Sequence, residues 1–173
     1  KIATVKSTGL EMASGKDLKN SDGKVLTNTP ICTVRLSANQ AINDNVSTKI
    51  QWDSEVIDTD NAFDSSTNYR FTVPTGKGGK YKVDVYSHLD TTANTNQRAV
   101  VLYLYKNGSV HSTLINNYTA NYLRATSMNL SVILDLSAAD YLEVYANSNT
   151  DNSGTSNVSA NQYSQLSIHR LIG

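Results

Sequence analysis

The chain has 173 residues, enough for one domain with a buried core, and its 15 Lys and Arg balance its 15 Asp and Glu. This neutral charge and the dispersed basic residues argue against nucleic-acid binding, and no stretch approaches the run of about 18 apolar residues that inserts into a membrane. Asn, Ser and Thr supply most of the polarity, and 10 Tyr stand against 2 Phe and 1 Trp, so the composition favours a surface of neutral hydrogen-bonding groups and tyrosines.

Residues 1–30 show no pattern that buries a core. Glycines at positions 9, 15 and 23 interrupt the segment, and the pieces SGKDL and DGKVL place apolar residues on both sides of a Gly-Lys turn. A segment of this kind cannot cover its few apolar side chains alone. We expect either a frayed tail or a stalk that intertwines with copies of itself.

From residue 31 the dominant periodicity is two, in short runs bounded by Asn, Gly, Asp and Ser, and helix signals are almost absent. The expected strands cover residues 33–36, 69–73, 81–86, 100–105, 110–115, 130–136, 142–144 and a last run from 166. Asn107-Gly108 follows the fourth run, and this pair predicts a hairpin turn. Roughly seven to ten short strands without helical spacers indicate an all-β antiparallel sandwich or jelly roll.

Residues 75–81 read TGKGGKY and raise the question of a phosphate-binding loop. Such a loop needs four residues between its first Gly and a Gly-Lys-Ser/Thr, followed by a helix. Here the spacing is absent, Lys80 precedes Tyr81 rather than Ser or Thr, and a period-two run follows. We expect a turn between two strands.

No other residue pattern indicates catalysis. His88, His111 and His169 have no paired spacing, and the single Cys32 lies in an apolar alternation that predicts a small buried side chain. Asp58 and Asp60 form an oxygen-rich pair, but Ca²⁺ needs about six oxygens or more and no EF-hand pattern supplies them. We expect no enzymatic activity, no cofactor and no metal. Hydrolysis of a polysaccharide by Asp58 and Asp60 is a minor alternative.

Four segments follow one another in a specific order. They are AFD at 62–64 with YRFTVP at 69–74 and GKY at 79–81, VVLYLYKNG at 100–108, LSVILDLSAADYLEVY at 130–145, and SQLSIHRLI at 164–172. In this order they resemble the C1q/TNF-like jelly-roll head domain. The resemblance implies a trimer in which one sheet of each jelly roll packs around a threefold axis.

The chain also departs from that pattern. Ala139 stands where the family has Gly, so that corner is expected to differ, and Lys77-Gly78 lengthens the turn after Pro74. The closing strand, SIHR, is more like members found in bacteriophage structural proteins, and GLEMASGKDLKNSDGKVLT resembles the stalk segments of phage tail fibres. We therefore predict a stalk over residues 1–30 and a jelly-roll knob over residues 31–173.

A trimer would bury the apolar residues of the stalk, and spare tyrosines of the knob would suit an amphipathic contact. The predicted interface residues of the homotrimer are Leu10, Met12, Leu18, Tyr103, Tyr105, Tyr141 and Tyr145.

The resemblance and the polar loops together predict a phage fibre knob that attaches the virion to a host surface. Loops at 90–98, 116–122 and 148–162 are rich in neutral hydrogen-bonding groups and Tyr, which suit the hydroxyls and the ring of a saccharide. The predicted ligand-binding residues are Asn94, Asn96, Arg98, Asn117, Tyr118, Tyr122, Asn149, Asp151 and Asn152.

The expected partners are a host glycan or receptor and other virion proteins, and the expected locations are the virion and, during assembly, the host cytoplasm. Two alternatives stay open: a purely structural capsid or tail decoration, and a secreted C1q-like ligand that binds a protein receptor.

Overall fold

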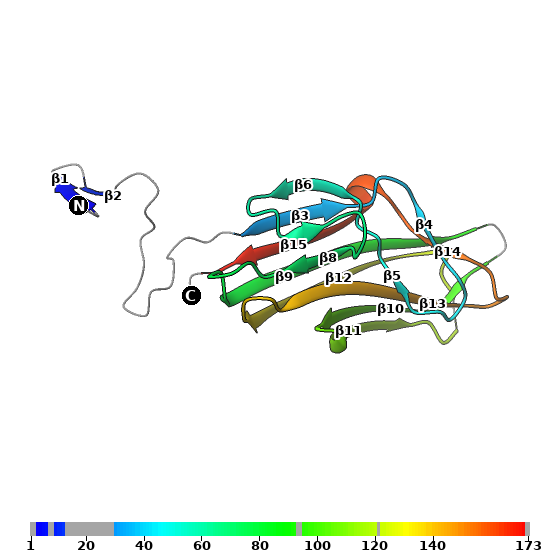
Figure 1. Cartoon of the computed structure of the whole chain (residues 1–173). Helices are drawn as coiled ribbons and strands as arrows, with labels where there is room; N and C mark the ends of the chain where they lie inside the picture. Colours follow the sequence, from blue (N-terminus) through cyan, green and yellow to red (C-terminus); the bar gives the residue numbers. More distant parts are fainter. Residues whose placement is uncertain (1–2, 7–8, 13–29, 93–94, 121, 172–173) are drawn as a thin grey trace.

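The computed structural model of the chain describes residues 3–6, 9–12, 30–92, 95–120 and 122–171 (Figure 1). Its first two strands, β1 (Ala3–Lys6) and β2 (Gly9–Met12), pair antiparallel with each other. The sequence did not predict this hairpin. Leu10 and Met12 lie on β2 but their side chains are outside the description, and Leu18 lies outside the described residues. The stalk boundary at residue 30 therefore stays a prediction.

The first sheet of the knob has the strand order β11-β10-β13-β8-β7, and β5 pairs with the edge of β13 that also carries β8. Its strands are β5 (Thr48–Lys49), β7 (Phe63–Asp64), β8 (Arg70–Thr72), β10 (Gln97–Lys106), β11 (Ser109–Asn117) and β13 (Tyr141–Thr150). All of its pairings are antiparallel.

The second sheet is built around the long strand β9, which pairs along one edge with β12 and along the other with β15 and then β14. Its strands are β3 (Ile31–Arg35), β4 (Gln40–Ile42), β6 (Ser54–Asp58), β9 (Gly79–Thr91), β12 (Ala125–Leu136), β14 (Ser156–Val158) and β15 (Ser164–Arg170). A short 3-10 helix, η1 (Asn161–Tyr163), precedes β15. These pairings are also antiparallel, so the described residues form an antiparallel β-sandwich.

The core lies between the two sheets, and the long strands β9 and β12 alternate between side chains that are buried in it and side chains that are not. On β9, Tyr81, Val83 and Val85 are buried, and the residues between them are exposed or half-buried. Fully buried side chains from both sheets complete the core: Cys32, Ile42, Ile50, Trp52, Phe71, Leu89, Leu102, Leu104, Met128, Leu136 and Leu142. Burial raises the pKa of the Cys32 thiol, so Cys32 is a buried core residue, as predicted.

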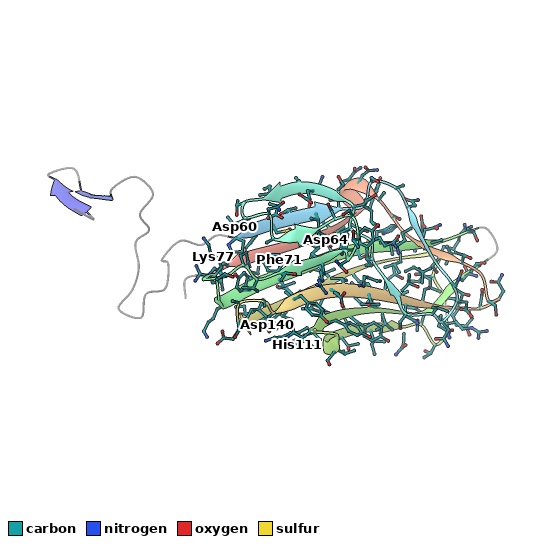
Figure 2. All side chains as sticks on the ribbon, in the orientation of Figure 1. Asp60, Asp64, Phe71, Lys77, His111 and Asp140 are labelled. Atoms are coloured by element: carbon teal, nitrogen blue, oxygen red, sulfur yellow. The ribbon has the colours of Figure 1, made fainter. Side chains whose placement is uncertain are left out.

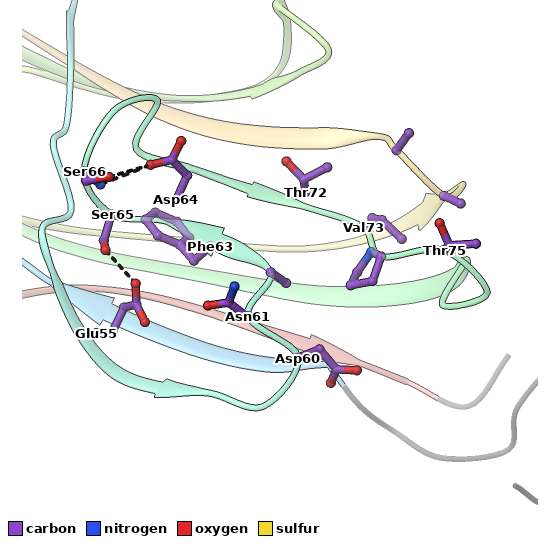
Figure 3. Close-up of a pocket in the computed structure, with 14 residues that line it drawn as sticks. Glu55, Asp60, Asn61, Phe63, Asp64, Ser65, Ser66, Thr72, Val73 and Thr75 are labelled. Atoms are coloured by element: carbon purple, nitrogen blue, oxygen red, sulfur yellow. Dashed lines mark hydrogen bonds between the residues drawn. The ribbon is translucent and has the colours of Figure 1, made fainter. Parts of the chain in front are cut away.

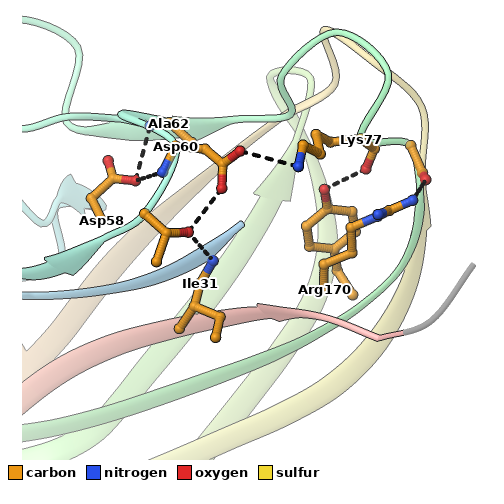
Figure 4. A network of polar contacts seen from close by, with 9 residues as sticks. Ile31, Asp58, Asp60, Ala62, Lys77 and Arg170 are labelled. Atoms are coloured by element: carbon orange, nitrogen blue, oxygen red, sulfur yellow. Dashed lines mark hydrogen bonds and ion pairs between the residues drawn. The ribbon is translucent and has the colours of Figure 1, made fainter. Parts of the chain in front are cut away.

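The glycine-rich stretch is a turn between β8 and β9, as predicted. Figure 4 shows how it is held: the Tyr81 hydroxyl donates to the Lys77 carbonyl oxygen at 2.5 Å, and Lys77 Nζ pairs with Asp60 Oδ1 at 3.4 Å. The buried Arg170 donates from Nη2 to the Gly78 carbonyl oxygen at 2.8 Å. These contacts join the turn to the end of β15 and to the β6–β7 connection.

Positive φ angles occur in this glycine-rich turn, in the β10–β11 hairpin and in the β12–β13 connection. Gly76 has φ 77°, Asn107 and Gly108 have φ 52° and 77°, and the β10–β11 hairpin forms where the Asn-Gly pair predicted it. Ala139 has φ 69° in the β12–β13 connection, a left-handed conformation that favours glycine. The chain therefore makes this corner with a residue that has a Cβ, at a cost in backbone strain.

The knob has two ends. β3 begins and β15 ends at one of them, where Figure 2 also places Asp60, Lys77 and Asp140. The β11–β12 and β13–β14 connections lie at the opposite end, which we call the distal end. The expected polar loop from residue 146 is shorter than predicted, because β13 continues to Thr150 and β14 and η1 occupy residues 156–158 and 161–163.

Candidate functional site

Connections that are far apart in the sequence are joined at the distal end. Asn96 donates from its backbone N to Asp151 Oδ1 at 3.0 Å and from Nδ2 to Asp151 Oδ2 at 2.9 Å, and the Asp151 N donates to the Asn96 carbonyl oxygen at 3.0 Å. Hydrogen bonds from the backbone and then the side chain of Asn96 lower the pKa of Asp151. Both residues were predicted to bind a ligand, and both also fasten the β9–β10 connection to the β13–β14 connection.

A second set of contacts tightens the same junction. Thr95 Oγ1 donates to Asn152 Oδ1 at 2.9 Å, and the Gly154 N donates to the same oxygen at 3.2 Å. Asp44 Oδ1 accepts from the backbone N of Thr150 at 2.7 Å and from its hydroxyl at 2.9 Å, which ties in the β4–β5 connection. No sequence pattern pointed to Asp44, because only the fold brings it to β13.

Arg98 and Tyr122 form the exposed part of this end. The Arg98 guanidinium carbon lies 5.3 Å from the centroid of the Tyr122 ring, a cation–π arrangement, and Arg98 Nη2 donates to the Asp151 carbonyl oxygen at 3.3 Å. Tyr122 keeps 40% of its surface exposed. An aromatic ring held in place beside a guanidinium and next to amide and carboxylate groups offers both a stacking surface and hydrogen-bonding groups.

Tyr118, another predicted ligand-binding residue, is the outer member of a hydrogen-bonded relay. Its hydroxyl lies 2.9 Å from Thr126 Oγ1, and Thr126 Oγ1 donates to Gln97 Oε1 at 2.6 Å. The single hydroxyl proton of Thr126 is used toward Gln97, so Tyr118 must be the donor to Thr126. Gln97 is fully buried, and its Nε2 donates the next hydrogen bond to the Leu89 carbonyl oxygen at 3.1 Å. This relay joins β9, β10, β12 and the β11–β12 connection by hydrogen bonds next to the distal end. Gln97 and Thr126 were not predicted from the sequence.

The remaining predicted ligand residues are spread over the neighbouring sheet. Asn117 on β11 and Asn149 on β13 flank Ala99 of β10 in register, so they lie on the outward face of the first sheet. Asn94 lies outside the described residues. The structure thus gathers Asn96, Arg98, Tyr122, Asp151 and Asn152 at one end, and places Asn117 and Asn149 on the adjoining strands.

The predicted interface tyrosines gather on the outward face of the first sheet. The rings of Tyr105 and Tyr145 lie 4.5 Å apart between centroids, and those of Tyr103 and Tyr105 lie 6.3 Å apart. The guanidinium carbon of Arg70 lies 4.4 Å from the centroid of Tyr141. All four tyrosines are half-buried, so this tyrosine face is partly covered by the chain's own residues.

The ion pair Lys49–Glu143 covers part of the tyrosine face. Lys49 Nζ donates to Glu143 Oε1 at 2.5 Å, to the Asn68 carbonyl oxygen at 3.2 Å, and lies 5.7 Å from the centroid of Tyr145. Burial by itself lowers the pKa of Lys49, but the hydrogen bond and the charge of Glu143 outweigh it and raise that pKa. Whether the tyrosine face meets another copy of the chain is still a prediction.

A cavity of about 700 Å³ lies between the β6–β7 connection, β8 and the β12–β13 connection (Figure 3). Its carboxylates are engaged: Glu55 Oε1 accepts from the Ser65 hydroxyl at 2.6 Å, and hydrogen bonds from Thr67, Asn68 and Ser66 hold the pKa of Asp64 well below its usual range. Each of these two carboxylates is thus held by neighbouring groups of the fold.

Asp58 and Asp60, the residues of the minor hydrolytic alternative, hold the same connection together (Figure 4). Asp58 accepts from the backbone N of Ala62 at 3.0 Å and of Phe63 at 2.8 Å, and Asp60 Oδ2 accepts from the Thr59 hydroxyl at 2.8 Å. Within the described part of the chain, no three His, Cys, Asp or Glu side chains gather as metal ligands. No helix among those residues is long and apolar enough to cross a membrane.

No family model and no curated protein matches the chain. Solved structures do. The globular domain of zebrafish complement 1qA protein superimposes with a TM-score of 0.55 at 10% identity, over 81% of this chain and 95% of that one. Eiger TNF from S. frugiperda superimposes with a TM-score of 0.58 at 11% identity, over 84% and 94%. The fold is thus a C1q/TNF-like jelly roll, as the sequence predicted.

Proposed function

We propose that the chain is a non-enzymatic recognition head, a homotrimer whose distal end binds a saccharide on a host cell surface, and that it serves as the knob of a phage fibre. The observation that carries the proposal is the Arg98–Tyr122 pair, an exposed aromatic ring with a fixed cationic neighbour at the end away from the start of β3. The resemblance of the sequence of residues 1–30 to a fibre stalk supports a location on a fibre.

The chemistry of the distal end favours a sugar over a charged ligand. A sugar ring presents C–H groups that pack on an aromatic face and hydroxyls that form many modest hydrogen bonds. Tyr122 supplies the face, and two exposed amides lie at the same end, Asn152 on the β13–β14 connection and Asn117 at the end of β11. Each such contact is weak, so three copies on one trimer would raise the affinity for a surface that carries many glycans.

The likeness to C1q and TNF domains supports the trimer, since that family is typically trimeric, and it supports a secreted ligand for a protein receptor equally well. An upstream signal peptide or collagen repeat in the gene would favour that second candidate. A structural decoration is the third candidate, and it requires no ligand at the distal end.

A glycan array probed with the whole chain tests the proposal. We expect binding to one class of glycan, weakened roughly tenfold or more by Tyr122→Ala and by Arg98→Ala, because each removes one side of the exposed pair. Tyr86→Ala is the matched control, since Tyr86 is also 40% exposed but lies on β9 away from the distal connections.

Host-cell adsorption separates the three candidates. Binding that survives protease treatment of the cells and is lost on glycosidase treatment supports the saccharide proposal. Binding lost on protease treatment alone favours a protein receptor. No binding to cells or glycans, together with a particle that falls apart without the knob, favours decoration.

A further inference from the structure

A second cavity, of about 350 Å³, lies on the outward face of the second sheet and is lined by Asn39, His88, Asp90, Ser159 and Tyr163. The odd-numbered residues of β9 face the core, so His88 and Asp90 face away from it. The volume falls within the range of about 300–1,000 Å³ that is usual for small-ligand sites. None of the five residues belongs to the Arg98–Tyr122 site.

Asp90 is the unusual residue of this cavity. Its Oδ1 is shielded from solvent and has no hydrogen-bond partner among the described residues, while the residue as a whole is half-buried and lines the cavity. Its neighbours in the sheet are Ala125 on β12 and Asn157 on β14. A carboxylate can accept at both oxygens, and Oδ2, which is not among the shielded atoms, is the oxygen that a donor in the cavity can reach.

The walls of the cavity offer the other contacts that a small ligand needs. The Tyr163 ring is 53% exposed and lies 6.0 Å from the His88 ring between centroids. His88 Nδ1 is held by the Ser127 hydroxyl at 2.9 Å, which fixes the imidazole. Asn39 Oδ1 accepts from the Ala160 N at 2.9 Å, so the chain orients the Asn39 amide, and among the described residues no partner is seen for its nitrogen. Its amide nitrogen is then a ready donor.

We propose that this cavity binds one neutral pyranose unit. Two adjacent hydroxyls of the sugar donate to Asp90 Oδ2, the carboxylate oxygen that is not shielded, the C–H face of the ring packs against Tyr163, and the Asn39 amide donates to a further sugar oxygen. The inference rests on the proposed function for its ligand class, and it adds a site on a different face. Each knob would then have two sugar-binding sites, one on the sheet face and one at the distal end.

The ligand class follows from what the cavity lacks. A divalent cation requires about six oxygens or more, and no ligand cluster of that kind gathers within the described residues. A sugar diol, in contrast, needs one carboxylate and one aromatic ring, and both are present. A protonated amine would also pair with Asp90, so the experiment includes one.

Saturation-transfer NMR on the whole chain tests the proposal, with methyl α-D-mannopyranoside, methyl β-D-glucopyranoside, methyl α-L-rhamnopyranoside and ethanolamine as probes. We expect at least one pyranoside to bind the native chain, and Asp90→Asn and Tyr163→Ala each to weaken it at least tenfold. Asp84→Asn is the matched control for the carboxylate, because Asp84 also faces outward on β9 but is paired with Ser131 at 2.6 Å and Lys82 at 3.0 Å. Tyr86→Ala controls for the ring.

Folding of each variant is checked by thermal melting. Asp90→Asn is expected to melt at the native temperature or above it, because Asp90 Oδ1 contributes no hydrogen bond to the fold. An Asp90→Asn variant that unfolds at a lower temperature would mean that the carboxylate is structural and would overturn the inference.

The remaining outcomes separate this site from the distal one. Loss of pyranoside binding in Tyr122→Ala but not in Asp90→Asn overturns the inference and leaves the proposed function standing. Loss in Asp90→Asn and Tyr163→Ala with none in Tyr122→Ala supports it, even if the distal site fails on the glycan array. Binding of ethanolamine alone, or a change in the mass of the assembly caused by Tyr163→Ala, overturns it.

Discussion

Gly154 lies so close to Thr95 that a Cβ on Gly154 would stand 2.3 Å from Thr95 Oγ1 and 2.8 Å from its methyl carbon. Thr95 is buried, and its hydroxyl is bonded to Asn152, so it has little room to move aside. Glycine at 154 is therefore what allows the β13–β14 connection to dock against the β9–β10 connection.

Replacing Gly154 by Ala should destabilise the knob by about 1–3 kcal/mol, the usual cost of forcing a methyl group into a packed site. Thr95→Ala removes the two nearest clashing atoms and leaves only Asn152 Oδ1 at 2.9 Å, so Gly154→Ala should cost less in that background. Urea unfolding of the two single variants and the double variant measures this coupling. Additive effects of the two substitutions would contradict the close approach.

The buried relay predicts unequal effects from removing two hydroxyls. Thr126→Val leaves Gln97 Oε1 buried without a donor and should cost about 1–3 kcal/mol, whereas Tyr118→Phe removes only the outer donor and should cost about 0.5–1.5 kcal/mol. Chemical denaturation measures both. Tyr122→Phe, whose ring is exposed, is the control and should leave the stability unchanged; an equal loss from all three variants would refute the assigned direction of the relay.

Ala139 gives a prediction of increased stability. At a φ of 69° an L-residue carries about 1–2 kcal/mol of backbone strain, which glycine avoids. Glycine also gives the unfolded chain more conformational freedom, and this smaller effect lowers the stability. Ala139→Gly should therefore stabilise the knob by about 0.5–1 kcal/mol. The neighbouring Ala138→Gly lacks a positive φ to relieve and should destabilise it by a similar amount. Thermal melting measures both variants. Melting temperatures that shift in the same direction in the two variants would rule this account out.

Asp140 predicts an acid-sensitive corner. Hydrogen bonds from Asn107 and Lys106 lower its pKa to about 2 from an ordinary value of about 3.9. A carboxyl whose pKa is lowered by folding contributes stability that is present above the ordinary pKa and is lost as the pH falls through about 4 toward about 2. The melting temperature of Asp140→Asn should thus fall below that of the native chain at pH 6, and this difference should narrow as the pH falls toward about 2.

The control for that titration is Asp135→Asn. Asp135 is exposed and pairs with Lys80 only at 3.4 Å, so its removal should matter little at any pH. If the difference in melting temperature between Asp140→Asn and the native chain stays constant from pH 6 to pH 2, the carboxylate does not hold the corner.

The proposed trimer predicts a mass in solution of three times 18.8 kDa. Light scattering coupled to size exclusion measures it directly. If the tyrosine face is the contact, Tyr103→Glu and Tyr105→Glu should split the trimer, because a charge buried at an interface is costly to desolvate. Asp84→Arg reverses a charge and adds a longer side chain on the outward face of β9, in the other sheet, and its effect on the mass tells which sheet meets the axis. A native mass of one chain would end the trimer proposal.

Much of the sandwich was predictable because strand signals are local. The alternation through β9, β10 and β12 and the Asn107-Gly108 turn each lie within a few residues, and the structure has all of them. The short strands β4, β5, β6, β7 and β14 escaped prediction. They have two to five residues, and several are half-exposed, so they form because a longer neighbour offers an edge to pair with.

The sequence by itself determined the fold class, the turn at TGKGGKY and the polar, tyrosine-rich connections, because side-chain alternation and turn chemistry depend on residues next to one another. Only the tertiary structure decided which of those connections meet. Asn96 and Asp151 are 55 positions apart and become partners because β10 and β13 lie side by side, and Asp90 gained an unpaired carboxylate oxygen because its sheet neighbours are Ala125 and Asn157. Such contacts depend on which strands pair and in which register, and no local pattern encodes that choice.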